Sequence, residues 1–504
     1  MEITIFILIT IIHVVTGSKT KSHPPVDLLT ATIPQLKEAL SSHQFTSKQL
    51  IQWYLERITK VNRKGPKLHA VIETNPGAMK IAHQLDLHKS FHQSRPLNGI
   101  PILVKDNIAT ADKMNTTAGS YALLGSRVPR DAFVVEKLRK AGAIILGKAS
   151  LSEWAGFRAS NSTRQGVSAR GGISKSAYLT DGDPSGSSSG PAIAVSIGLC
   201  AAALGTETDG SIIQPAGRNG IVGLKPTVGL TSRSGVVPIS HRQDSIGPMG
   251  RTVGDVALLL EVIQGEDWRD DATQNVPMRQ SNYTQYLKGT NGFKNMRLGI
   301  VRQGIFTNLN SEVVSTFDKA IKLMKSHGAH IQDPMDIDTI DEIMNGTAEV
   351  EVLLMDFKQD IQHYLSELIP KRTKVPRTLA DLIDFNNHHS NKEFSTYMPD
   401  QDYFLMAENS TTTENITDYI RLSKSVEQIM NKYNADALVL PADVFPSPSA
   451  ISGLPTITVP LGYLNKTEGL QPFGIAFIAR AWNEGILLQL AHAFEQATHV
   501  REKV

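Results

Sequence analysis

Short apolar runs alternate with amphipathic stretches along most of the chain. A buried strand that ends at Lys105 is predicted by "GIPILVKDNIA", because its apolar run lies between Gly99 and a polar turn. A helix and then a strand are predicted in "AFVVEKLRKAGAIILGKA", and a strand and then a helix in "MRLGIVR" and "SEVVSTFDKAIKLMKSHGAHI". Further strands are expected in "ADALVLP", "TITVPLG" and "GIAFIAR", before a closing amphipathic helix in "EGILLQLAHAFEQAT". This alternation predicts an α/β fold in which a mixed, mostly parallel sheet is sandwiched between helices.

The order of the predicted elements, without a repeat or a linker, favours one large domain. Thr32 with Gln35, and Thr46 with Gln49, have capping-box spacing and predict two helices before the first strand. The section from about 270 to 430 has little strand signal, so we expect a variable and mainly helical covering there. We find no internal repeat and no low-complexity linker. A single domain over residues 27–500 is therefore predicted.

The N-terminus has the pattern of a secretory signal. Residues 3–15 are apolar apart from Thr4, Thr10 and His13, and small residues follow at positions 16–18. A membrane anchor is the alternative, but the run is shorter than the roughly 20 residues that a spanning helix needs. We therefore expect a signal peptide at 1–17, a mature protein that is secreted or in the secretory lumen, and no stable membrane insertion.

The sequons fit passage through the secretory pathway, and the cysteine content excludes an internal disulfide. Candidate N-glycosylation sites occur at Asn115, Asn161, Asn282, Asn345, Asn409, Asn415 and Asn465. Cys200 is the only cysteine, so no internal disulfide can form. It lies in the apolar run "AIAVSIGLCAAALG", which is typical of a buried thiol rather than a nucleophile.

Charge and motif content argue against several classes of function. The formal net charge is +2 with no basic block, so a nucleic-acid partner is not expected. The Gly/Ser clusters could cradle a phosphate, but no G-K-[ST] ending or G-x-G-x-x-G pattern accompanies them. His388 and His389 have no cysteine or carboxylate at ligand spacing, so no metal site is expected. No cofactor is predicted.

Three motifs occur in order in the middle of the chain: "SGSSSG" at 185–190, "GTETDGS" at 205–211 and "GLKPT" at 223–227. Together with "LNGIPILVKDNIATADKMNTTAGSYAL" and "AGAIILGKASLSEWA", they resemble the amidase signature family. The resemblance covers most of the chain outside the signal and the 270–430 section. It implies the amidase signature fold and a Ser-Ser-Lys triad.

Matching the motifs residue by residue, the resemblance places the nucleophile at Ser211 and the base at Lys105. It places a bridging serine at Ser187, after a cis Gly186–Ser187 bond. It further implies an oxyanion hole of backbone N–H groups from Thr208, Asp209, Gly210 and Ser211. The chemistry is consistent, because a lysine that burial keeps neutral can accept a serine proton through a second serine.

Other polar residues in these segments have simpler explanations. His241 with Asp244 could suggest a base, but a polar loop accounts for both residues, since the triad needs no histidine. Lys148 is interpreted as structural, an exposed or paired residue at a strand end. Many relatives have arginine two residues after the nucleophile, where this chain has Ile213 and then Gln214. The role of this pair, and with it the substrate, stays open.

These observations predict a secreted amidase that cleaves a small-molecule or peptide carboxamide through an acyl-enzyme on Ser211. An acyltransferase or esterase with the same triad, or a non-catalytic secreted binding protein with this fold, are the alternatives. The family also includes the amidotransferase component that acts on charged transfer RNA, but the signal and the near-neutral charge argue against that role. We expect the 270–430 section to supply part of the substrate pocket. The sequence does not indicate an oligomeric state.

Overall fold

A computed structural model describes residues 24–87, 95–277, 279–307, 309–370, 375–411, 415–442, 444 and 446–501. The predicted signal peptide at 1–17 lies outside the described residues. The core is an 11-stranded sheet with the strand order β1-β4-β2-β7-β9-β8-β14-β15-β13-β10-β11. In that order the strands are β1 (Val71–Thr74), β4 (Ile144–Ala149), β2 (Pro101–Lys105), β7 (Ala202–Glu207), β9 (Ser245–Gly250), β8 (Val222–Lys225), β14 (Thr456–Lys466), β15 (Gly469–Ile478), β13 (Ala437–Pro441), β10 (Arg297–Ile300) and β11 (His330–Gln332).

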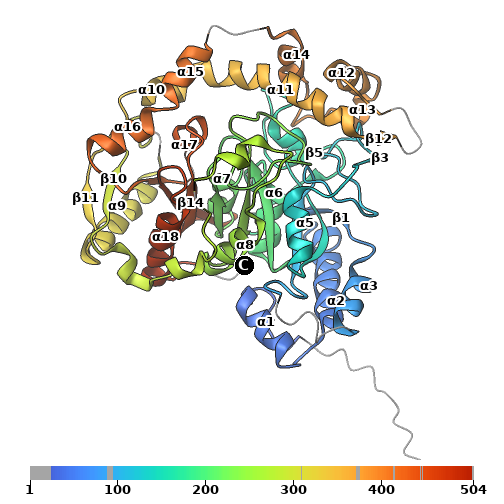
Figure 1. The fold of residues 1–504 in the computed structure, drawn as a ribbon, viewed down its shortest axis with the longest axis horizontal. Coiled ribbons are helices and arrows are strands. Elements are labelled where there is room, and N and C mark those ends of the chain that lie inside the picture. Colours follow the sequence, from blue (N-terminus) through green and yellow to red (C-terminus); the bar gives the residue numbers. More distant parts are fainter. Residues whose placement is uncertain are drawn as a thin grey trace, which may run out of the picture.

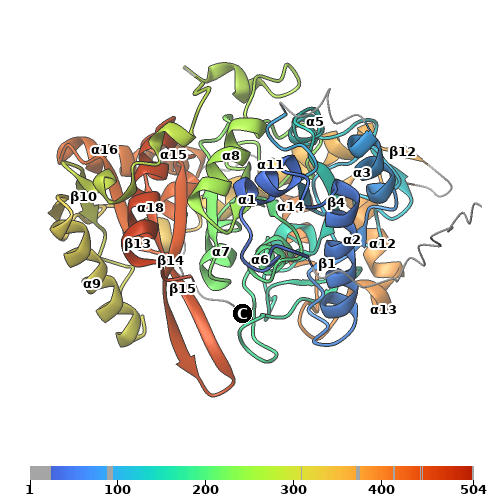
Figure 2. The same ribbon diagram turned by 90° about the horizontal axis from the view of Figure 1, so that it is seen from below.

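The sheet is mixed, as predicted. Parallel pairing is confined to two flanks, where β4, β2 and β7 form one group and β13, β10 and β11 the other. Between and outside these flanks the described pairs are antiparallel, and they outnumber the parallel ones. The antiparallel pairs, among them the long β14–β15 hairpin that projects from the body in Figure 2, could not be predicted, because strand direction depends on which apolar runs pair.

Helices cover the sheet, which confirms the α/β sandwich. Within the first part of the chain the helices are α1 (Ile33–Ser41), α2 (Ser47–Ile58), α3 (Ala78–Leu87), α5 (Phe133–Lys140), α6 (Ser189–Ser196), α7 (Ile213–Arg218) and α8 (Val253–Ile263). Thr32 and Thr46 form the predicted capping boxes of α1 and α2. The helices α6 and α7 contact each other and the central strands, whereas α8 contacts both α5 and the C-terminal helix α18 (Glu484–Thr498).

The section from about 270 to 430 is largely helical, as expected. Its helices, with the short α17 that follows, are α9 (Ser311–Ser326), α10 (Ile340–Asn345), α11 (Ala348–Glu367), α12 (Leu379–His388), α13 (Ser390–Glu393), α14 (Asp402–Asn409), α15 (Ile416–Leu422), α16 (Ser425–Lys432) and α17 (Ser447–Ile451). Figure 1 shows α10 to α15 as an arc over one end of the core. This section also contributes β10 and β11 to the sheet edge, and β12 (Ile369–Pro370), which pairs with β3 (Ser126–Arg127). One further two-stranded sheet joins β5 (Val167–Ser168) to β6 (Gly172–Ile173).

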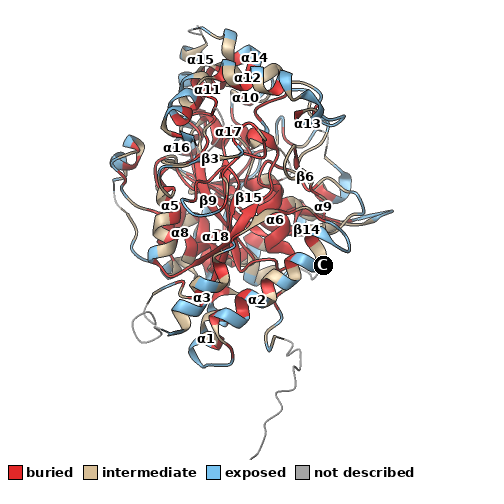
Figure 3. Ribbon diagram, turned by 90° about the vertical axis from the view of Figure 1, so that its right-hand side faces the viewer, coloured by how far each residue is buried: buried red, intermediate tan, exposed pale blue. Residues whose placement is uncertain are grey.

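Buried apolar side chains concentrate at the sheet and at the helices against it, as the red core of Figure 3 shows. Strand β2 is buried along its whole length, so it carries Lys105 out of solvent. Cys200 is buried in this core, where burial raises the pKa of its thiol to about 12. No helix within the described ranges has the length and apolarity needed to cross a membrane.

Candidate active site

Lys105, the last residue of β2, points its amine into a small set of hydroxyl and carbonyl oxygens. Its Nζ lies 2.7 Å from Ser187 Oγ, 2.9 Å from Thr206 Oγ1 and 3.1 Å from the Thr206 carbonyl oxygen. Asn107 Nδ2 donates to the same Thr206 hydroxyl at 2.9 Å. Parallel pairing of β2 with β7 brings Lys105 beside Thr206, although the two lie 101 positions apart in the sequence.

Burial changes the acid–base character of Lys105. The side chain is fully buried, and burial lowers the pKa of Lys105 to about 7, against the opposing influence of the Glu207 and Asp244 carboxylates. A lysine with this pKa is uncharged in a large fraction of molecules near neutral pH. It can therefore accept a proton, which an exposed lysine cannot do under these conditions.

Ser211 lies in the turn between β7 and α7, and Glu207 fixes that turn. The Glu207 carboxylate accepts hydrogen bonds from the backbone N–H groups of Ile212 (2.6 Å) and Ile213 (2.9 Å) at the start of α7. Gly210 has φ +77°, a conformation that a side chain disfavours, so glycine is needed here to complete the turn. The Glu207 side chain thus shapes the nucleophile turn, a role that the sequence did not indicate.

The serine cluster at 185–190 lies against the turn that contains Ser211. The backbone N–H of Ser188 donates to the Ser211 carbonyl at 3.1 Å, and the Gly186–Ser187 peptide bond is cis, as the family resemblance implied. Ser187 and Ser211 line the same cavity, which has a volume of about 460 Å³. Lys105, Ser187 and Ser211, three residues from three distant segments, therefore come together at one concave site.

Residues from the helical section form part of this cavity, as we expected. The cavity lining includes Glu349, Val350 and Leu353 of α11, together with Met398 and Tyr403. Gln214 also lines the cavity, whereas Ile213 is buried in the core behind it. Of the two unusual residues after the nucleophile, only Gln214 can therefore contact a substrate.

The four residues proposed for the oxyanion hole occupy the turn at the cavity. Within the described part of the chain, the backbone N–H groups of Thr208, Asp209 and Ser211 donate no hydrogen bond, whereas that of Gly210 faces the Glu207 carboxylate. The Thr208 side chain donates to Asp244 at 2.6 Å, and its carbonyl accepts from Gln243 Nε2 at 3.2 Å. Hydrogen bonds to Gln243 and Asp244 therefore fix the position of Thr208 in this turn.

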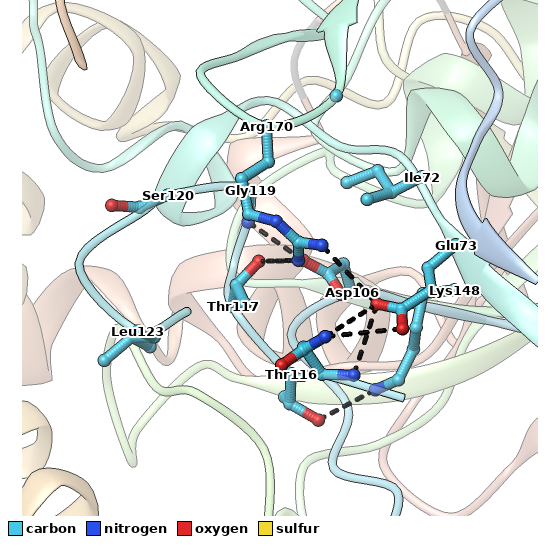
Figure 4. Close-up of polar contacts among 12 residues, drawn as sticks. Ile72, Glu73, Asp106, Thr116, Thr117, Gly119, Ser120, Leu123, Lys148 and Arg170 are labelled. Atoms are coloured by element: carbon cyan, nitrogen blue, oxygen red, sulfur yellow. Dashed lines mark hydrogen bonds and ion pairs between the residues drawn. The ribbon is translucent and has the colours of Figure 1, made fainter. Parts of the chain in front are cut away.

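Lys148 belongs to a separate buried cluster beside the triad. It lies on β4, donates to the Ile108 carbonyl and to Thr116 Oγ1, and is fully buried rather than exposed. Asp106 accepts from Thr117 Oγ1 at 2.5 Å and lies 3.8 Å from Arg170 (Figure 4). These contacts fix the loop that follows Lys105, which supports the structural interpretation of Lys148.

The histidines singled out in the sequence lie away from the reaction centre. His241 is half-exposed and contacts Asp360 at 3.0 Å, while Asp244 accepts from backbone N–H groups of its own loop. His388 and His389 contact backbone carbonyls of α12. Among the described residues, no group of three or more His, Cys, Asp or Glu side chains could hold a metal ion.

The predicted glycosylation sites differ in accessibility. Five sequon asparagines are exposed: Asn161, Asn282, Asn345, Asn409 and Asn465. Asn415 is half-buried. Asn115 is also half-buried, its Nδ2 donates to Glu73, and the hydroxyl-bearing residue of its sequon, Thr117, is fully buried. In the folded chain Asn115 is therefore the least suited of the seven to carry a glycan.

Four residues of the site were missed in the sequence: Thr206, Asn107, Gln243 and Glu349. Thr206 and Asn107 orient Lys105, and both lie within or beside a motif, which is a weak signal. Gln243 donates to Glu349 at 2.7 Å and accepts from Tyr419 Oη at 3.0 Å, so it joins the helical section to the nucleophile turn. No local pattern in the sequence indicates these long-range contacts.

Comparison with known proteins agrees with this arrangement. The Amidase family model matches residues 49–450. A protein of Arabidopsis thaliana named "probable amidase" is 43% identical over 98% of this chain and 94% of its own length. The crystal structure of the peptide amidase of Stenotrophomonas maltophilia is 38% identical, covers 94% of this chain and 98% of its own, and superimposes with a TM-score of 0.86. One component of the glutamyl-tRNA(Gln) amidotransferase of Caldanaerobacter subterraneus is 30% identical over 94% of this chain and 97% of its own.

These matches extend over nearly the whole chain, in both sequence and structure. The chain therefore belongs to the amidase signature family, as the motifs predicted. It is an amidase, a hydrolase that acts on the carbon–nitrogen bond of amides.

Proposed function

We propose that this amidase works through a Ser211–Ser187–Lys105 relay and forms an acyl-enzyme on Ser211. One observation carries the proposal: the buried Lys105 has its Nζ 2.7 Å from Ser187 Oγ, at a cavity that Ser187 and Ser211 both line. A serine hydroxyl is a weak nucleophile until a base takes its proton. Lys105 has the burial that this role requires.

The contact between Lys105 and Ser187, and the cavity that Ser187 shares with Ser211, support the following reaction. As Ser211 Oγ attacks the carbonyl carbon, its proton passes to Ser187, and the Ser187 proton passes to neutral Lys105. Backbone N–H groups of the 208–211 turn donate to the oxyanion. The proton returns through Ser187 to the leaving nitrogen, the carbon–nitrogen bond breaks, and the amine or ammonia departs. Water then repeats the sequence on the ester and releases the carboxylic acid.

The substrate is proposed to be the carboxamide of a small molecule or peptide. A solved relative is a peptide amidase, and the cavity of about 460 Å³ is large enough for a short amide. Transfer RNA is not proposed, since the chain has a net charge of only +2.

The signal pattern at 1–17 and the exposed sequons support secretion, which N-terminal sequencing of the mature protein tests.

A fluorophosphonate probe tests the nucleophile directly. We expect one probe molecule per chain, attached to Ser211 by peptide mass spectrometry, together with release of acid and ammonia from a simple amide. Labelling at another serine, or none at all with a folded protein, would contradict the assignment. Release of a hydroxamate in place of acid when hydroxylamine is added would reveal acyl transfer from the same intermediate.

The pH profile tests Lys105 as the base. Because its pKa is lowered to about 7, the neutral form predominates above that pH, and kcat/KM for a neutral amide should rise up to tenfold per pH unit below 7 and then level off. Removing the negative charge in Asp244→Asn should shift this rise to lower pH, because the Asp244 carboxylate favours the charged lysine. A profile that is flat between pH 6 and 8, or one that does not move in the variant, would argue against Lys105.

A further inference from the structure

Two carboxyl groups at the active-site cavity have no cation within ion-pair distance in the described part of the chain. Asp209 and Glu349 both line the cavity that contains Ser211. Asp209 Oδ2 accepts from the neutral Ser447 hydroxyl at 2.6 Å, and Glu349 Oε1 from the neutral Gln243 amide at 2.7 Å. Carboxyl groups withdrawn from solvent are normally matched by a positive charge, so this pair needs an explanation.

The other charges of the cavity wall cancel. Arg158 and Glu153 are fully buried and form an ion pair at 2.5 Å. Among the described residues that line the cavity, they are the only other charged ones. The described cavity therefore has an excess of acidic groups and no free cation of its own.

The Asp209 carboxyl group is only partly provided with hydrogen-bond donors. Its Oδ2 accepts from Ser447, whereas its Oδ1 is buried and has no hydrogen-bond partner within the described ranges, which disfavours the ionised form. Burial raises the pKa of Asp209 to about 7, although Lys225 attracts its charge from beyond ion-pair distance. Burial also raises the pKa of Glu349 to about 8, and the charge of Asp209 adds to that shift. A nearby ammonium group would stabilise the ionised form of both side chains.

We propose that Asp209 and Glu349 select cationic substrates: amides that carry a protonated amine within a few bonds of the scissile carbonyl. The inference rests on the proposed function, because Ser211 fixes where the carbonyl carbon lies. Asp209 precedes Ser211 by two residues in the same turn, so its carboxyl group is close to the reaction centre. The ammonium then supplies the missing positive charge.

The remaining wall suits the carbon skeleton of such a substrate. Phe157, Leu353 and Met398 contribute apolar surface to the cavity. A wholly apolar acyl chain could pack there too, but it brings no positive charge, so the two carboxyl groups would stay in the protonated form that burial favours. Charge, rather than size, is therefore the property that the cavity discriminates.

Two isosteric amides test this selection: 3-aminopropanamide, whose amine is protonated at pH 8, and butyramide, which has a methyl group in its place. We expect kcat/KM to be at least about tenfold higher for the cationic amide, since removing one partner of a buried charge pair has effects of this size or larger. The ratio should fall about tenfold in Glu349→Gln. It should stay unchanged in Glu342→Gln, which removes the same charge from an exposed side chain of α10.

A binding measurement keeps the result independent of turnover. The cationic amide should protect Ser211 from the fluorophosphonate probe at concentrations where butyramide does not. Equal protection and equal kcat/KM for the two amides would overturn the selection, while labelling of Ser211 would still support the nucleophile. A chain that the probe does not label at Ser211 would instead refute the proposed function itself.

Discussion

Replacement of Ser211 by alanine should lower kcat/KM for amide hydrolysis by at least about 10⁴-fold, because loss of a nucleophile removes the covalent route altogether. The fold should not change: Ser211 is partly exposed, and its hydroxyl forms no hydrogen bond within the described residues, so the free energy of unfolding should change by less than about 0.5 kcal/mol. Steady-state rates with thermal unfolding of the same preparation measure both effects.

The chain supplies a matched control for this experiment. Ser189 lies in the neighbouring serine cluster, and its buried hydroxyl has no hydrogen-bond partner in the described part of the structure. Ser189→Ala should therefore keep most of the activity. If Ser211→Ala retained near-normal turnover, or if both alanine variants lost it equally, the nucleophile would have to be assigned elsewhere.

Replacement of Lys105 by methionine should lower kcat by about 10³- to 10⁴-fold, with a much smaller change in KM, because proton transfer of this kind contributes up to that factor. Methionine fills similar space without the amine, which limits the cavity left behind. Labelling of Ser211 by the fluorophosphonate should slow by a comparable factor, since the probe also needs an activated hydroxyl. Rapid-quench kinetics and timed labelling measure the two effects.

A structural role alone would give a different pattern for Lys105. If the residue only supported β2, then Lys105→Met would lower the melting temperature and leave the pH dependence of the residual rate as in the wild type. We expect the opposite, a loss of the rise near pH 7 in a variant that still unfolds cooperatively. Full activity in a folded Lys105→Met protein would exclude it as the base.

The alternation of strands and helices could be predicted because apolar runs and capping boxes are local signals. The strand at 101–105, the helices after Thr32 and Thr46, and the helical character of the 270–430 section follow directly from such patterns. Strand direction could not be predicted in the same way. It depends on which runs pair, and the β14–β15 hairpin is set by a turn rather than by the composition of either strand.

The candidate site likewise contains residues that could be predicted from motifs and residues that only the fold brings together. Lys105, Ser187 and Ser211 lie in motifs, and the structure brings Lys105 and Ser187 into direct contact. Thr206 and Asn107 were missed because threonine is common in strands and asparagine in loops, so neither residue by itself indicates a functional role. The Gln243–Glu349 contact joins residues 106 positions apart, so only the fold reveals it. The cavity's excess of acidic groups is likewise a property of three-dimensional arrangement.

The link through Gln243 has a consequence for recombining amidases. Tyr419 of α15, Glu349 of α11 and the Thr208 carbonyl all share hydrogen bonds with this one amide. A chimera that imports the helical section from a relative would separate these helices from their native glutamine. Crossover points should therefore keep residues 239–245 and the section from α11 to α15 together from one parent, so that they are inherited as a unit.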